Sequence, residues 1–114
     1  MHSKFFKGMT PQELEQKIND TQGILVYFKN DFCAPCKALR PKVSDLMETA
    51  FPQMEMVVVD TVTHPELAGK YNVFGNPTIL VFFEGREYIR KSKYISMPEM
   101  QGEVERLYNM VFEA

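Results

Sequence analysis

Cysteine and histidine are scarce in this sequence. The 114 residues include two cysteines and two histidines, too few for the disulfide framework that stabilises many small secreted proteins. A structural zinc site normally takes four ligands, and only His2 and His64 could join the two cysteines. We therefore expect no metal site within one chain, and no cofactor.

Long apolar runs and a large excess of charge are also missing. No stretch approaches the roughly 20 apolar residues of a membrane span, and residues 1–8 lack the apolar core of a signal peptide. The formal net charge of −2 argues against a general binder of nucleic acids or acidic membranes. The length suits one domain over residues 1–114, and a cytoplasmic location is the default expectation.

The two cysteines that are present lie close together, in Phe32-Cys33-Ala34-Pro35-Cys36-Lys37. Before them, residues 23–28 form a short apolar, β-prone run. After them, apolar residues recur every three or four positions from Leu39 to Ala50, the spacing of one helical face. The pattern places the pair where a strand leads into a helix, with Cys33 at or beside the helix start.

This position favours a reactive thiolate at Cys33. Free backbone N–H groups and the helix dipole stabilise an anion at a helix start, and they lower a cysteine pKa there. Cys33 is therefore the candidate nucleophile, and Cys36, one turn further on, could attack a mixed disulfide formed at Cys33. An inert, buried cysteine pair remains the alternative.

Other local patterns indicate an α/β fold. Three Ser/Thr-x-x-Glu patterns, each with a proline in the first turn, predict helices that open at Thr10, Thr63 and Ser96. Apolar runs predict strands, and Glu84-Gly85 predicts a turn into an edge strand that carries several cations. We expect a central mixed sheet of four or five strands with helices on both faces. The expected strands span residues 4–6, 23–28, 54–60, 79–83 and 86–94.

Three segments of the sequence resemble the thioredoxin family. Cys33-Ala34-Pro35-Cys36-Lys37 differs in one residue from the usual Cys-Gly-Pro-Cys-Lys of that family. Pro41 matches the proline that bends the active-site helix, and Gly75-Asn76-Pro77-Thr78 matches the segment whose cis-proline faces the disulfide. The resemblance implies a thioredoxin fold with a redox disulfide between Cys33 and Cys36.

The resemblance also implies a function and a substrate surface. We expect a protein disulfide oxidoreductase that acts on protein disulfides and receives electrons from a donor such as a thioredoxin reductase. Asn76 would pair with an extended substrate through its backbone, and Gly75 would allow that segment to approach closely. The substrate-binding residues implied are Phe32, Ala34, Pro35, Gly75, Asn76 and Pro77.

The sequence departs from the family at several positions around this site. Tyr27 stands where the family carries a buried aspartate, and Val58 where it carries a lysine. Ser92-Lys93-Tyr94 replaces a small loop that contains glycine. These departures leave two alternatives open: a binding or adaptor module with weak turnover, and, with less support, a glutathione-dependent enzyme similar to glutaredoxin.

Overall fold

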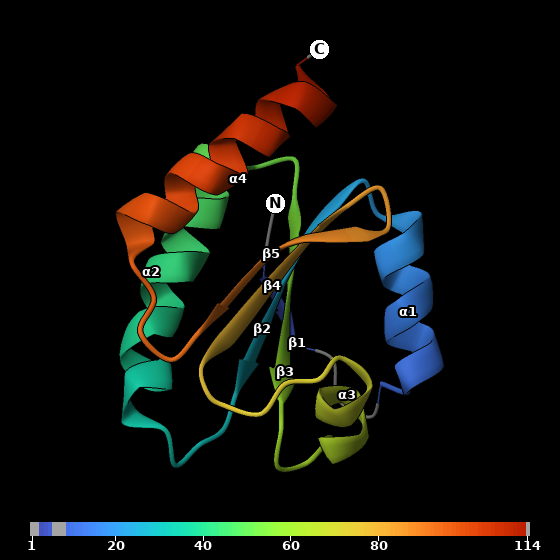
Figure 1. Cartoon of the computed structure of the whole chain (residues 1–114), viewed down its shortest axis with the longest axis vertical. Helices are drawn as coiled ribbons and strands as arrows, with labels where there is room; N and C mark the ends of the chain where they lie inside the picture. The colour runs from blue at the N-terminus through green and yellow to red at the C-terminus, as the bar shows by residue number, and fades with distance from the viewer. Residues whose placement is uncertain (1–2, 6–8, 114) are drawn as a thin grey trace.

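A five-stranded sheet lies between two pairs of helices in the computed structural model, which describes residues 3–5 and 9–113 (Figure 1). The strands and helices alternate along most of the chain and then end with a hairpin and a helix. In chain order they are β1 (Ser3–Phe5), α1 (Pro11–Asp20), β2 (Gly23–Lys29), α2 (Ala34–Ala50), β3 (Glu55–Asp60), α3 (Pro65–Lys70), β4 (Thr78–Phe83), β5 (Arg86–Ser92) and α4 (Met97–Phe112).

The sheet has the order β1-β3-β2-β4-β5. Strands β1, β3 and β2 are parallel, whereas β4 runs antiparallel to β2 and β5 antiparallel to β4. The predicted mixed sheet is therefore confirmed, with β1 as its fifth strand. That strand starts one residue earlier than expected, and Phe6, at the end of the prediction, lies outside the described residues.

Helices α1 and α3 cover one face of the sheet, and α2 and α4 cover the other (Figure 1). Strand β2 shows why both faces need cover, because its side chains alternate between two apolar clusters. Leu25 and Tyr27 pack on the side of α2 and α4, while Val26 and Phe28 pack on the side of α1 and α3. Helix α2 is thus anchored on the same face as Tyr27.

Two of the three predicted helix starts are confirmed. Thr10 forms a capping box with Glu13, and the Ser96 side chain accepts a hydrogen bond from the Glu99 backbone. The third start was placed wrongly, because α3 begins one residue later, with His64 as its N-cap and no side-chain cap bond. The Thr63 hydroxyl instead lies 2.9 Å from His64 Nδ1, which leaves it no capping role.

The closing hairpin turns at Glu84 and Gly85, as predicted. Both residues have positive φ, 55° and 81°, which suits a tight two-residue turn between right-twisted strands. The following strand was predicted to reach Tyr94, but β5 ends at Ser92. Lys93 ends it because its φ of 66° is left-handed and turns the chain away from the sheet.

Candidate active site

The two cysteines form a disulfide across the first turn of α2, with their Cα atoms 5.2 Å apart. Cys33 is the N-cap residue, and its sulfur accepts a hydrogen bond from the Cys36 backbone N–H at 3.2 Å. Cys33 is partly exposed, whereas Cys36 is 1% exposed. The predicted junction of strand and helix is therefore confirmed, and solvent reaches one cysteine much more readily than the other.

A short turn carries the chain from β2 to Cys33. The Asn30 side-chain oxygen accepts a hydrogen bond from the Phe32 N–H at 2.8 Å, and the Asn30 backbone oxygen accepts one from the Cys33 N–H at 3.2 Å. This double anchoring fixes the turn without using the Phe32 side chain, which is 91% exposed beside the disulfide. Ala34 and Pro35 are also exposed, on the first turn of α2.

Tyr27 lies directly beneath this turn. Its ring is fully buried, and its hydroxyl donates a hydrogen bond to the Cys36 carbonyl oxygen at 2.7 Å. Burial raises the pKa of Tyr27 to about 12, although the nearby positive charge of Arg40 opposes this rise. The phenol therefore keeps its proton near neutral pH and holds the backbone of Cys36 in place.

The position that faces Tyr27 on the neighbouring strand carries no ionisable side chain. Val58 is the residue of β3 that pairs with Tyr27 across the sheet, and it is 1% exposed. The two departures from the family thus form one uncharged pair beneath the disulfide. A cavity of about 390 Å³ nevertheless borders Cys36 and is also lined by Lys37 and Arg40. Charged side chains line part of this cavity, and it is large enough to hold water.

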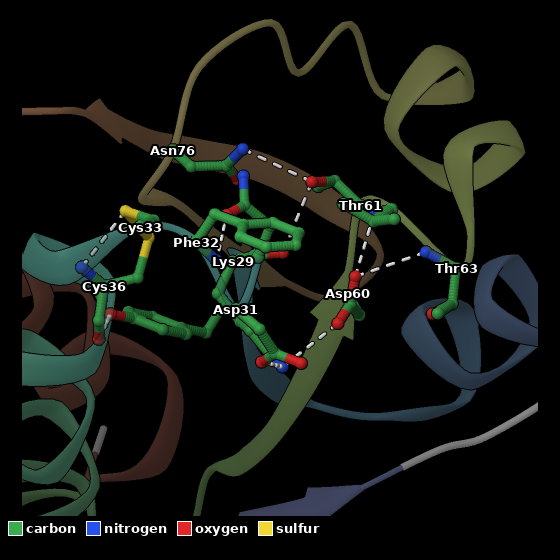
Figure 2. A network of polar contacts seen from close by, with 12 residues as sticks. Lys29, Asp31, Phe32, Cys33, Cys36, Asp60, Thr61, Thr63 and Asn76 are labelled. Carbon is green, nitrogen blue, oxygen red and sulfur yellow. Dashed lines mark hydrogen bonds and ion pairs between the residues drawn. A yellow bond between two sulfur atoms is a disulfide. The ribbon is translucent and has the colours of Figure 1, made fainter.

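An ion network joins the end of β2 to the end of β3 (Figure 2). The Lys29 ammonium lies 2.7 Å from the Asp31 carboxylate and 3.1 Å from that of Asp60. Asp60 also accepts hydrogen bonds from the N–H groups of Val62 and Thr63. This network could not be predicted from the sequence, because nothing in the local spacing shows that residues 29 and 60 meet.

These contacts shift the pKa of both central groups. Burial by itself raises the pKa of the Asp60 carboxyl, but the N–H donors and the Lys29 ammonium outweigh it and lower the pKa. Burial likewise acts to lower the pKa of Lys29, and the two carboxylates more than reverse this and raise it. Both groups are therefore held in their charged forms beside the active-site turn.

The loop before β4 contains the predicted cis peptide bond, between Asn76 and Pro77. The Asn76 side-chain N–H donates to the Thr61 hydroxyl at 3.3 Å (Figure 2), and the Thr61 backbone N–H donates to the Lys29 carbonyl oxygen at 2.8 Å. Pro35 and Pro77 line the same groove, so this loop lies against the first turn of α2. The fold thus brings residues 29–36 and 75–77 together.

The side chain of Lys93 occupies the space above Gly75. A Cβ atom added at Gly75 would lie 2.9 Å from Cε of Lys93, whose side chain extends across this glycine. The absence of a side chain at Gly75 therefore makes room for a residue of the same chain. This contact was not predicted, because it joins two loops that are far apart in sequence.

Two exposed aromatic residues near the site were also missed. Phe74 is 89% exposed immediately before Gly75, and Tyr94 is 97% exposed on the groove beside Pro77. Each could have been suspected from its position next to a family landmark. Neither belongs to a periodic apolar pattern, which is consistent with their exposure.

The sequence between Phe5 and Glu105 matches the family model Thioredoxin. The chain belongs to the thioredoxin family. It is 34% identical to Thioredoxin-2 of Pyricularia oryzae over 76 residues, 67% of this chain and 44% of that protein. It is 35% identical to Protein disulfide-isomerase 1 of Caenorhabditis elegans over 81 residues, 68% of this chain and 17% of that protein. The chain therefore spans less than half the length of both relatives.

A solved structure extends the similarity over almost the whole fold. The X-ray structure of Fasciola hepatica thioredoxin has a TM-score of 0.77 and 30% identity, with 93% of this chain and 98% of that chain covered. In this thioredoxin-family chain, the cysteine pair at the start of α2 supports thiol–disulfide oxidoreductase activity. Over residues 3–5 and 9–113, no three His, Cys, Asp or Glu side chains cluster as a metal site would require. None of the helices described has the length and apolar character needed to cross a membrane.

Proposed function

We propose that this protein reduces disulfide bonds in other proteins, with Cys33 as the nucleophile and Cys36 as the resolving thiol. The single observation that carries this assignment is the unequal exposure of the two cysteines at the start of α2. Cys33 is partly exposed and takes the N-cap position, while Cys36 is 1% exposed within bonding distance of it. A substrate sulfur can approach Cys33 but not Cys36.

The exchange takes two balanced steps. The Cys33 thiolate attacks one sulfur of the substrate disulfide, so that a bond forms to Cys33 and the other substrate sulfur leaves as a thiolate. The Cys36 thiolate then attacks Cys33, which forms the intramolecular disulfide and releases the second substrate thiolate. A pair of electrons passes to the substrate, and an external donor such as a thioredoxin reductase returns the pair.

The substrate surface would combine an apolar platform with backbone pairing. Phe32, Ala34 and Pro35 present exposed groups around Cys33. The backbone of Asn76 would pair with an extended polypeptide, as strands pair at a sheet edge. Because reduction requires a supply of reducing equivalents, the protein would work in a reducing compartment such as the cytoplasm.

Turnover with a protein disulfide tests the proposal. The reduced protein should speed the reduction of such a substrate by an external dithiol, and Cys33→Ser should abolish this effect. A Cys36→Ser variant should stop at the mixed disulfide and accumulate substrate on Cys33, identified by peptide mapping. If the unmodified protein speeds the reduction of neither a protein disulfide nor a glutathione mixed disulfide, the proposed enzymatic function is wrong.

A binding or adaptor role is the second candidate. It is favoured by the unionised pair Tyr27 and Val58 beneath the disulfide and by the Lys93 side chain over Gly75. Capture with Cys36→Ser, compared with a Cys33→Ser, Cys36→Ser double variant, separates the two roles. Partners held by the single variant alone support redox turnover, and partners held equally by both variants support the adaptor.

A further inference from the structure

We propose that the groove beside Pro77 selects substrates that carry an acidic residue about three positions from the reacting cysteine, the span that an extended chain covers over about 10 Å. This inference rests on the proposed disulfide reduction and specifies its substrate class. The groove, here called the α2 groove, has a volume of about 520 Å³. Its walls come from α2 and from the loop between β5 and α4, and the residues that matter here are Pro35, Leu39, Lys42, Pro77, Lys93 and Tyr94.

The charged side chains of the α2 groove are both cationic. Lys42 and Lys93 line it, and no aspartate or glutamate does. Within the described residues, neither lysine has a carboxylate within ion-pair distance. Other basic residues in that part of the chain do have one, such as Lys70 with Glu15 and Lys91 with Glu103. The positive charge of the groove is therefore available to a partner from outside.

Lys93 is fixed in place by its backbone and its side-chain stem. Its N–H donates a hydrogen bond to the Pro77 carbonyl oxygen at 2.8 Å, and its φ of 66° turns the chain over the loop before β4. The aliphatic stem then crosses Gly75. This arrangement keeps the ammonium beside the loop where substrate backbone would pair. Tyr94, the next residue, is 97% exposed and lines the same groove.

The length of the groove sets the position of the acidic residue. Lys42 follows Pro35 by seven residues of α2, so it lies about 10 Å further along the helix at about 1.5 Å per residue. An extended polypeptide advances about 3.3 Å per residue, so about three residues cover that distance. A substrate cysteine bonded to Cys33, beside Pro35, would thus bring an acidic side chain about three residues away to Lys42, with Lys93 across the groove.

The apolar groups between the two lysines suit the rest of such a segment. Pro35 and Leu39 of α2 line the groove together with Pro77 and Tyr94. An apolar or aromatic residue between the cysteine and the acidic residue would cover them. The expected substrate is therefore an extended, partly apolar segment with one acidic group, rather than a highly charged one.

Synthetic peptides test this specificity directly. Each contains one cysteine linked through a disulfide to 5-thio-2-nitrobenzoate, with Glu or Gln placed about three residues before or after it. In the reduced Cys36→Ser variant, the Cys33 thiolate attacks the peptide sulfur, and thionitrobenzoate leaves with the electron pair of the broken bond. Its absorbance gives the rate, and mass spectrometry confirms that the peptide is bound to Cys33.

For one of the two placements, before or after the cysteine, the Glu peptide should react about three- to tenfold faster than the matching Gln peptide. This is the range expected of two exposed charge pairs. Adding Lys42→Gln and Lys93→Gln should bring the Glu/Gln ratio close to one. Lys93→Arg should preserve the ratio, and so should Arg106→Gln, which removes the same charge from an exposed position on α4. Raising the salt concentration should lower the ratio by screening.

Two results would overturn the inference and leave the proposed function standing. One is a Glu/Gln ratio near one on both sides of the cysteine while all the peptides react. The other is a ratio that persists in the double lysine variant. If none of the peptides reacts with Cys33, the proposed disulfide reduction fails as well, and the selectivity fails with it.

Discussion

Replacing Tyr27 with Phe removes one hydroxyl group from the centre of the site and leaves the ring in place. The hydroxyl is buried and donates to the Cys36 carbonyl oxygen at 2.7 Å. Loss of one partner in a buried hydrogen bond costs about 1–3 kcal/mol. The helical N–H of Arg40 remains as a donor to the same oxygen. We therefore expect the lower end of this range, about 1 kcal/mol, which corresponds to a fall in Tm of about 4 °C for a chain of this size.

The same variant tests whether Tyr27 handles a proton. Since the pKa of Tyr27 is raised to about 12, the phenol cannot accept the Cys36 proton near neutral pH. The attack of Cys36 on a mixed disulfide should therefore keep its rate within about threefold, a change of less than 1 kcal/mol in the barrier, and keep its pH profile. Stopped-flow release of a chromogenic thiol from Cys33 measures this step. A large loss of rate, or a pH profile that loses one ionisation, would show that the phenol transfers protons.

A carboxylate at this position should have the opposite effect on rate. Without a base at position 27, Cys36 can lose its proton to water in the adjoining cavity, which Asp31 also lines, or to the departing thiolate. Tyr27→Asp should speed resolution by supplying a base, at a stability cost of about 3–5 kcal/mol for the lost aromatic ring. Tyr27→Asn is the matched control, because it has the same size but no base. Equal rates for the Asp and Asn variants would mean that the absence of a base at this position does not limit resolution.

The remaining predictions concern the hairpin and the ion network. Gly85→Ala should lower the unfolding free energy by at least about 1 kcal/mol, because φ is 81° and the new Cβ would lie 3.1 Å from Oδ1 of Asn19. Urea denaturation measures this loss, and an unchanged midpoint would contradict it. Asp60→Asn should cost about 1–2 kcal/mol near neutral pH by removing the charge that pairs with Lys29. Because folding lowers the pKa of Asp60, its contribution is present above the unfolded value of about 3.9 and is lost as pH falls through the folded value. The cost of Asp60→Asn should therefore disappear in strong acid, and a cost that does not change with pH would rule out the charge pair as its cause.

The parts of this fold that were predicted correctly are those with a local physical signal. A buried strand such as β2 is a continuous apolar run, and the starts of α1 and α4 follow from Thr10 and Ser96 as side-chain acceptors. The same pattern at Thr63 gave a wrong prediction, because a capping sequence makes an N-cap possible at that residue but does not require the helix to begin there. There the chain enters α3 one residue later, and His64 occupies the position.

The features that were missed depend on which loops meet in space. The pairing of Lys29 with Asp60 requires β2 and β3 to end side by side, and the packing of Lys93 over Gly75 requires two loops to converge beside Pro77. No spacing along the chain encodes either contact. The family landmarks located the cysteines, the proline and the position of Tyr27 correctly, but they did not reveal these loop contacts.

The most direct test of the account is the order in which the two cysteines of the reduced protein react with a limiting amount of iodoacetamide near neutral pH. Peptide mapping by mass spectrometry then assigns the label. Cys33 is partly exposed at the N-cap of α2 and Cys36 is 1% exposed, so nearly all of the early label should be on Cys33. Early label on Cys36 would contradict the assignment of Cys33 as the nucleophile.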